Sequence, residues 1–184
     1  MGQINTPKPV KLIVAMISQS AELFAIAIEQ MQKLWGEVDI ISDNLKFDYT
    51  KYYKKEMGEN LLRKFVSFEN LIDPGEIAGI KHKTNEMEEQ LALTPEGKKF
   101  GVDRPINLDP GYIEPAKLVL ATTKNFSHRI YIGENMFAEV TLYYKHESWH
   151  SFPFTFPDYA SGDYNVFLDP VRAKLLEQTK KVKN

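Results

Sequence analysis

The stretch VKLIVAMISQSAELFAIAIEQMQKLWG, residues 10–36, decides how the fold begins. Its first part, residues 11–18, is a compact apolar run of the length expected for a buried strand. Over residues 21–35 the apolar side chains recur at helical spacing, with Ser20 placed to cap the start and Gly36 placed to end the helix. The stretch therefore predicts a buried strand that leads directly into an amphipathic helix.

The residues that follow continue this alternation of strands and helices. Residues 37–48 and 61–68 favour strands, and residues 49–60 form a polar, aromatic loop or short helix between them. The sequence DPGE at residues 73–76 has the spacing of a capping box with proline at the first helical position, so it predicts a second helix. A strand at residues 105–109 would complete a ferredoxin-like βαββαβ core, in which an antiparallel sheet carries both helices on one face.

A β-hairpin is predicted further along the chain. Residues 128–132 and 137–144 favour strands, and they flank the turn sequence GENM at residues 133–136. If residues 128–132 are a strand, His128 and Arg129 point to opposite faces. Either of them could then share a face with Glu139, because a bulge at Gly133 would shift the register.

The rest of the second half is less regular. Residues 114–124 fit either a strand or a helix that begins at Pro115. The aromatic stretch SFPFTFPDYASGDY, residues 151–164, is expected to fold over and pack on the sheet, and a stacking platform or lid for a planar ligand is the alternative. Asp169 and Pro170 predict the cap and first position of a terminal helix over residues 169–180.

These elements predict an α+β protein with a ferredoxin-like βαββαβ core, to which a C-terminal β-hairpin, an aromatic loop and a terminal helix are added. The length fits a single domain over residues 1–184. Within it, residues 10–93 form the βαββα part, and residues 104–172 form the part with the strand, the hairpin and the aromatic loop.

Composition restricts the functional class. The chain contains no cysteine, which excludes disulfides, thiolate metal sites and cysteine nucleophiles. A net charge of -2 gives no support for a nucleic-acid partner, since such proteins usually carry a concentrated basic surface. The apolar run at residues 12–17 is too short to span a membrane. We therefore expect a cytoplasmic protein without a membrane partner.

The densest polar signal runs from residue 104 to residue 141, where ionisable groups alternate with apolar ones. Such groups are costly to bury without a partner, so they indicate a site for a small anionic ligand. The candidates for acid/base catalysis are Asp109, His128 and Glu139; those for ligand binding are Lys124, Arg129, Tyr131, Asn107 and Thr141. The structural alternative is a turn at residues 109–111 and a cross-strand pair between Arg129 and Glu139.

The sequence HESWH at residues 146–150 matches the HExxH pattern of zinc hydrolases. In those enzymes two histidines one helical turn apart face the metal, and the glutamate activates water. Here strand-favouring residues precede the motif and Pro153 and Pro157 follow it, so a helix is disfavoured. We therefore predict no metal site. The glycine-rich phosphate loops GxxxxGK[ST] and GxGxxG do not occur either.

The chain contains, in this order, the blocks FDYTKYYKKEMG, LLRKFVSFENLIDP, IKHKTNEME, RPINLDPGYI, LATTKNFSHRIYIG, AEVTL and FPDY. Together they resemble the prokaryotic family catalogued as domain of unknown function 4416, from about residue 10 to residue 172. The resemblance implies candidate site residues and no particular activity. The blocks contain Arg63, Lys81, Asn85, Asn107, Asp109, Lys124, His128, Arg129, Tyr131, Glu139 and Thr141.

The leading functional hypothesis is the binding or transformation of a small ligand that carries a phosphate or a carboxylate. The alternative is a non-enzymatic, homo-oligomeric binding module whose polar residues form a structural network, with a sheet face or edge forming a homodimer. A zinc-dependent hydrolase that uses HESWH is the second alternative. The sequence leaves the cofactor, if any, unknown.

Overall fold

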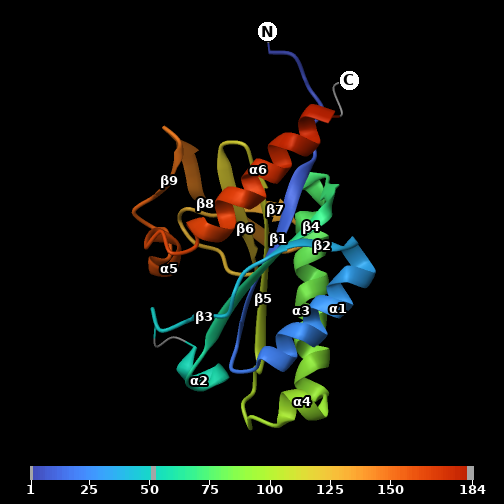
Figure 1. Ribbon diagram of the computed structural model, residues 1–184, viewed down its shortest axis with the longest axis vertical. Coiled ribbons are helices and arrows are strands. Elements are labelled where there is room, and N and C mark those ends of the chain that lie inside the picture. Colours follow the sequence, from blue (N-terminus) through green and yellow to red (C-terminus); the bar gives the residue numbers. More distant parts are fainter. Residues whose placement is uncertain (1, 51–52, 182–184) are drawn as a thin grey trace.

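A computed structural model describes residues 2–50 and 53–181, and within them the fold is a mixed α+β arrangement of six helices and a nine-stranded antiparallel sheet (Figure 1). The elements of the first half are β1 (Val10–Ser18), α1 (Ala21–Trp35), β2 (Val38–Ile41), β3 (Leu45–Lys46), α2 (Lys54–Met57), β4 (Leu62–Ile72), a 3-10 turn (Pro74–Glu76), α3 (Ile77–Leu93) and α4 (Pro95–Lys98). Those of the second half are β5 (Ile106–Glu114), β6 (Lys117–Thr122), β7 (Ile130–Gly133), β8 (Met136–Lys145), β9 (Ser148–Ser151), α5 (Pro157–Ala160) and α6 (Asn165–Lys181).

The strands lie in the order β2-β4-β1-β5-β6-β8-β7, with β3 beside β4 and β9 beside β8. The predicted strand and helix at the start of the chain are confirmed as β1 and α1. As predicted, the Ser20 hydroxyl accepts a hydrogen bond from the Leu23 N–H (3.3 Å), and Gly36 follows the helix with φ +92°. Positive φ is a conformation that glycine adopts without steric cost. The first half of the chain therefore folds largely as its local sequence indicates.

Helices cover both faces of β1, which explains the unbroken apolar sequence of its residues 12–17. Leu12 and Val14 pack in the core that includes residues of α1 and α3. Ile13 and Ala15 point the other way, into a second core that includes residues of α6. In Figure 1, α6 crosses the upper part of the sheet, and α1 and α3 lie beside its lower part. A strand covered on both faces is expected to lack polar alternation.

Strand β5 runs straight through the sequence Asp109-Pro110-Gly111, so the alternative of a turn at these residues is wrong. β6 pairs with β5 only from Gly111 onward. Before that point, side chains of α3 bind the free edge of β5: the Leu108 N–H donates to Glu88 Oε1 (2.7 Å), and Lys81 Nζ donates to the Leu108 carbonyl (2.8 Å). Pro110 has no N–H that would need a partner. The two strands therefore separate on the N-terminal side of Gly111 in β5.

The hairpin around residues 133–136 is confirmed as β7 and β8. Glu134 and Asn135 have φ values of +51° and +59°, as a two-residue type I′ turn requires. Gly133 also has a positive φ, +93°, and the pairing shifts between Tyr131 and Gly133. The predicted bulge at Gly133 is therefore present.

The predicted start of that hairpin is wrong. β7 begins at Ile130, and residues 127–128 form a turn before it. Because His128 and Arg129 lie outside the strand, the alternation of faces does not apply to them. The sequence left open whether His128 or Arg129 lies beside Glu139. In the structure both side chains contact the Glu139 carboxylate.

Two stretches that the sequence left ambiguous are now defined. Residues 114–124 form a tight turn and strand β6, not a helix, because Glu114 pairs with Lys117 across a hairpin. Residues 49–60 include the short helix α2. Lys51 and Tyr52 of this segment lie outside the described residues.

The terminal helix begins earlier than predicted. α6 starts at Asn165, and Pro170 lies inside it and not at its first position. The added turn carries Phe167 and Leu168, which are buried in the core beneath the helix. Burial of these side chains outweighs the local preference for a start at Asp169.

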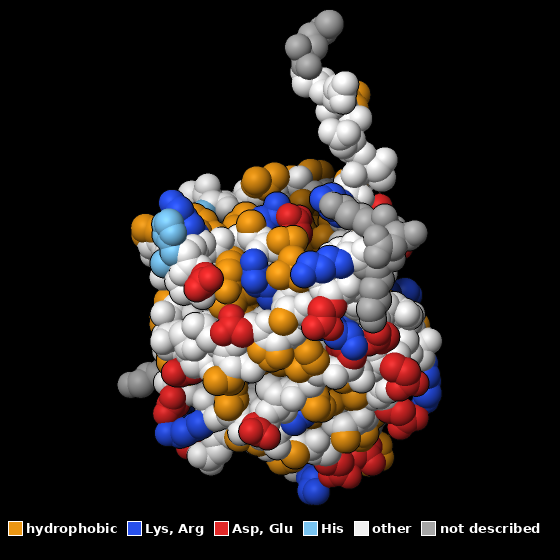
Figure 2. Space-filling view, turned by 45° about the horizontal axis from the view of Figure 1, so that its top comes forward, with side chains coloured by type: hydrophobic (Ala, Val, Ile, Leu, Met, Phe, Trp, Pro, Cys, Tyr) orange, Lys and Arg blue, Asp and Glu red, His pale blue; other side chains and the backbone are white. Residues whose placement is uncertain are grey.

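The surface carries mixed charge. On the face shown in Figure 2, basic and acidic side chains are interspersed with exposed apolar ones. Among the described residues, no helix combines the length and the apolar character needed to cross a membrane.

Candidate functional site

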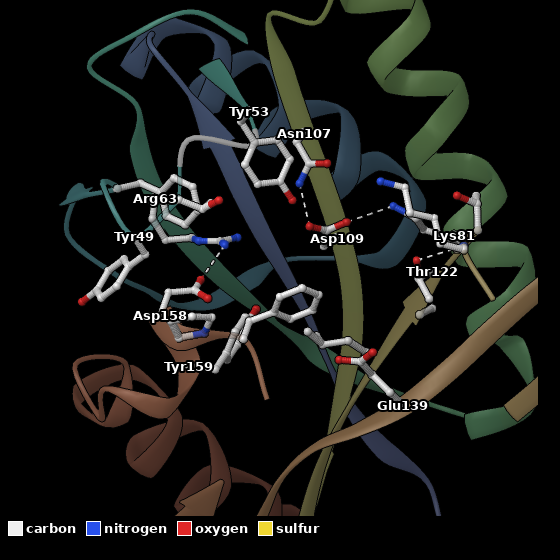
Figure 3. A pocket seen from close by; sticks show the side chains of 18 of the residues that line it. Tyr49, Tyr53, Arg63, Lys81, Asn107, Asp109, Thr122, Glu139, Asp158 and Tyr159 are labelled. Atoms are coloured by element: carbon white, nitrogen blue, oxygen red, sulfur yellow. Dashed lines mark hydrogen bonds and ion pairs between the residues drawn. The ribbon is translucent and has the colours of Figure 1, made fainter. Parts of the chain in front are cut away.

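A cavity of about 540 Å³ lies where β5 and β6 separate, next to α5 (Figure 3). Aromatic rings and charged side chains line it together. Among the described residues, the charged side chains in its wall are Arg63, Lys81, Arg104, Asp109, Lys124, Arg129, Glu139 and Asp158. Cations outnumber carboxylates in this wall, so the cavity favours a negatively charged ligand.

Arg63 of β4 and Lys81 of α3 are the two most buried described cations of the wall, with exposed fractions of 4% and 3%. Arg63 donates through its Nη2 to Asp158 Oδ2 (2.8 Å). Its Nε and Nη1 are also buried but have no hydrogen-bond partner among the described residues. The described rings that surround its guanidinium are Phe47, Phe65, Tyr159 and Tyr164, at 4.8 to 5.8 Å from the ring centres.

The strand places this arginine. Successive side chains of β4 alternate between the two faces of the sheet, and Phe65 joins the core on the α6 side while Val66 joins the core that includes α1 and α3. Arg63 therefore points to the α6 side, where Asp158 of α5 and the cavity lie. Figure 3 shows its guanidinium directed into the cavity.

The arginine and the tyrosines at this end of the cavity all keep their protons near neutral pH. Burial opposes the charge of Arg63, but interactions with Tyr159, Tyr164 and Asp158 outweigh it and raise the pKa of Arg63. Burial raises the pKa of Tyr159 well above its ordinary value, and it raises the pKa of Tyr53 to about 12. Both tyrosines therefore keep their hydroxyl protons, and the Tyr159 hydroxyl is a second buried donor without a partner among the described residues.

Asp109 of β5 lies in the middle of the cavity wall in Figure 3. It accepts a hydrogen bond from Asn107 Nδ2 (2.6 Å) and forms an ion pair with Lys81 Nζ (3.2 Å). Burial alone would raise the pKa of Asp109, but Lys81, Arg63 and the Asn107 hydrogen bond lower it below the ordinary value. Its side chain keeps an exposed fraction of 29%, so an ionised carboxylate is accessible from the cavity.

Arg104 connects this carboxylate group to α3. It donates to Glu88 Oε2 through Nε (2.9 Å) and Nη2 (2.7 Å), and it also contacts Asn107. Glu88 in turn accepts the Leu108 N–H at the free edge of β5. The helix therefore positions Asn107, and through it Asp109.

Glu139 of β8 forms a third polar group of the wall. Arg129 Nε donates to its Oε2 (2.7 Å), and His128 Nε2 lies 3.1 Å from the same oxygen. The other oxygen, Oε1, is buried and has no hydrogen-bond partner among the described residues. The His128 ring stacks on Phe154, with ring centres 4.3 Å apart.

The structure brings together five of the predicted site residues in the cavity wall, namely Asn107, Asp109, Lys124, Arg129 and Glu139. His128 contacts Glu139 but does not line the cavity. Tyr131 is 58% exposed and packs on Phe137 away from the cavity, and Thr141 is fully buried outside its wall. The roles of Tyr131 and Thr141 stay predictions that this arrangement does not support.

Sequence reasoning from residues alone missed Arg63, Lys81 and Asp158. Arg63 and Lys81 lie in blocks that carry the family resemblance, and the signal for Arg63 was the basic pair Arg63-Lys64 within an otherwise apolar strand sequence. Asp158 lies in the aromatic stretch, part of which packs in the core through Tyr159 and Tyr164. Phe156 of the same stretch lines the cavity, so the stretch contributes both to the core and to the site.

The HESWH motif does not form a helix. His146 and Glu147 make the turn between β8 and β9, with φ values of +50° and +60°, and Trp149 pairs with Tyr144. His150 lies in β9, and its ring stacks on Tyr143. The two histidines are therefore not placed one helical turn apart, as the zinc motif requires.

One family model matches residues 8–175 of the chain, and it is described as a domain of unknown function, DUF4416. No curated protein and no solved structure matches the chain.

Proposed function

The chain belongs to the family described as domain of unknown function 4416, and we propose that it binds a small anionic ligand, a phosphate or a carboxylate, in the cavity between β5 and β6. The observation that carries this proposal is Arg63. A buried guanidinium with two nitrogens that lack a partner among the described residues needs acceptors, since an unsatisfied charged donor costs more than a neutral one. Nε and Nη1 can each donate a charge-assisted hydrogen bond to an oxygen of a phosphate or a carboxylate.

Other groups support the same ligand class. The Tyr159 hydroxyl beside Arg63 is a protonated donor that has no partner among the described residues. Lys81 and Arg104 have carboxylate partners in Asp109 and Glu88, so part of their charge is balanced within the protein. The volume of about 540 Å³ is in the range typical of small-molecule sites.

We propose that Asp109 is the acid/base group if the ligand is also transformed. Its lowered pKa keeps it ionised near neutral pH, and its carboxylate is accessible from the cavity. His128 does not line the cavity but contacts Glu139, which does, so it would act through Glu139 and not directly on a ligand.

We also propose that residues 10–114 form a ferredoxin-like core. The strand order β2-β4-β1-β5, with residues of α1 and α3 in one core on the same face of the sheet, supports this proposal. A cytoplasmic location stays a prediction.

The ligand proposal is tested by isothermal titration with inorganic phosphate and with malonate, on the parent protein and on Arg63→Lys. Lysine keeps the charge near Asp158 but replaces the planar guanidinium, with its several fixed donors, by a single ammonium nitrogen. We expect affinity for the better anion to fall about tenfold or more. The matched control is Arg172→Lys, because Arg172 lies over the Tyr144 ring and does not line the cavity.

Equal affinity in the parent protein and in Arg63→Lys would contradict the proposal, as would the absence of anion binding in the parent. A loss of stability in Arg63→Lys, combined with no anion binding in the parent, would favour the alternative of a structural polar network in a homo-oligomeric module. If Arg63→Lys does not fold, Tyr159→Phe tests the same end of the cavity.

A further inference from the structure

The carboxylate of Glu139 offers an acceptor at a second place in the cavity wall. Glu139 is 3% exposed and lines the cavity. Arg129 and His128 both bind its Oε2, whereas its buried Oε1 has no partner among the described residues. Because Glu139 pairs with Leu120 of β6, and paired residues share a face of a sheet, both side chains face the cavity.

A buried carboxylate oxygen is stabilised by a hydrogen-bond donor, and the described residues supply none to Oε1. In Figure 3, Glu139 and Arg63 lie on opposite sides of the cavity, with Asp109 above the space between them. The two sides differ in what they offer a ligand: Arg63 offers hydrogen-bond donors, and Glu139 offers an acceptor. A ligand that satisfies both must carry an anionic group and, at a distance from it, a donor.

We infer that the ligand is a hydroxylated anion, a phosphorylated or carboxylated polyol or sugar, whose anionic group binds Arg63 and whose hydroxyl donates to Glu139 Oε1. This inference rests on the proposed function of the cavity. A hydroxyl fits better than an ammonium group for two reasons. Arg129 already pairs with the Glu139 carboxylate, and cations outnumber carboxylates among the described residues of the wall.

The test uses alkyl phosphates from ethyl to hexyl, each with a methyl, a hydroxyl or an ammonium terminus. Titration of the parent protein should show, at one chain length or more, about tenfold tighter binding of the hydroxyl form than of the methyl form. The ammonium form should bind more weakly than the hydroxyl form. These comparisons need no variant.

Glu139→Gln then tests whether Glu139 causes the preference for the hydroxyl form. A glutamine that directs its carbonyl at Arg129 and His128 presents an amide donor where Oε1 was, so the bond from the ligand hydroxyl to a carboxylate is replaced by a weaker neutral bond from the amide to the hydroxyl oxygen. The preference for the hydroxyl form should therefore fall clearly, while inorganic phosphate binds as in the parent. Comparing the two forms in both proteins cancels the hydrophobic contribution of the methyl terminus. Glu134→Gln, an exposed position in the turn of the same hairpin, is the control.

Equal binding of the three forms by the parent protein would overturn the inference, and so would a hydroxyl preference that persists undiminished in Glu139→Gln. In both cases phosphate binding that depends on Arg63 would survive, and the proposed function with it. Failure of the proposed function looks different: no phosphate compound binds, or Arg63→Lys binds them all as the parent does.

Discussion

At the scale of single residues, two buried tyrosines beside Arg63 differ in one respect. The Tyr164 hydroxyl donates to Asp158 Oδ2 (3.0 Å). The Tyr159 hydroxyl has no partner among the described residues, although Tyr159 is only 4% exposed. Buried hydroxyls are normally hydrogen-bonded, so the missing partner of Tyr159 supports its proposed role as a donor to the ligand.

Replacing each tyrosine with phenylalanine should therefore have opposite effects. Tyr159→Phe removes an unsatisfied polar atom, so its free energy of unfolding should equal or exceed that of the parent protein, while anion affinity falls. Tyr164→Phe breaks a buried hydrogen bond to a carboxylate and should cost about 1.5–3 kcal/mol. Urea denaturation measures both. A loss of that size in Tyr159→Phe without any change in anion affinity would assign Tyr159 to the structural network instead.

At the scale of elements, the separation of β5 from β6 creates the site, and Gly111 marks where the two strands meet. A Cβ added at Gly111 would lie 2.3 Å from the Val119 carbonyl oxygen of β6 and 2.6 Å from Leu120 Cδ2. The close approach of the two strands at this point therefore requires glycine. Gly79 of α3 differs, because its nearest neighbour would be the exposed Glu134 carboxylate at 3.8 Å.

Alanine substitutions at these two glycines should change the free energy of unfolding in opposite directions. Gly111→Ala forces the backbone of β6 away from β5 and should destabilise the protein by about 2 kcal/mol or more. Gly79→Ala should stabilise α3 by up to about 1 kcal/mol, because alanine has the higher helix propensity. Thermal unfolding monitored by circular dichroism compares them. A neutral Gly111→Ala would show that the strand pair tolerates a wider spacing than its contacts indicate.

At the scale of the whole molecule, the two cores share the central strands. β1 contributes to both of them, and α6 packs on the face opposite to that of α1 and α3. The tryptophans report on one core each: Trp35 of α1 packs against the first, and Trp149 of β9 lies in the second, where its Nε1 donates to Asp169 (3.0 Å). Shared strands predict a single cooperative unit, in agreement with the single domain expected from chain length.

Trp149→Phe and Trp35→Phe leave one fluorescent reporter each. In urea, the fluorescence midpoint of each variant should coincide with its own midpoint by far-ultraviolet circular dichroism. Comparing the two signals within one variant removes the effect of the substitution on stability. An earlier fluorescence transition for Trp149 alone would instead divide the chain into a stable first half and a separately unfolding second half.

The candidate site was only partly predictable. Asn107, Asp109 and Glu139 were identified because ionisable or amide groups in apolar strand sequence are unusual. Arg63 and Asp158 are 95 residues apart, and neither segment by itself indicates that they meet. The predicted roles of Tyr131 and Thr141 relied on spacing within one hairpin, and spacing does not define which side of the sheet holds a cavity.

The sequence by itself determined the local structure: the buried strand β1, the capped helix α1, and the turn of the hairpin at Glu134 and Asn135. These follow from backbone sterics and hydrophobic period, which act between near neighbours. Only the tertiary structure decided that β5 and β6 separate and that Arg63 pairs with Asp158 in the wall of a cavity. Those contacts depend on strand order and register, and these are set by the packing of the whole chain rather than by any one segment.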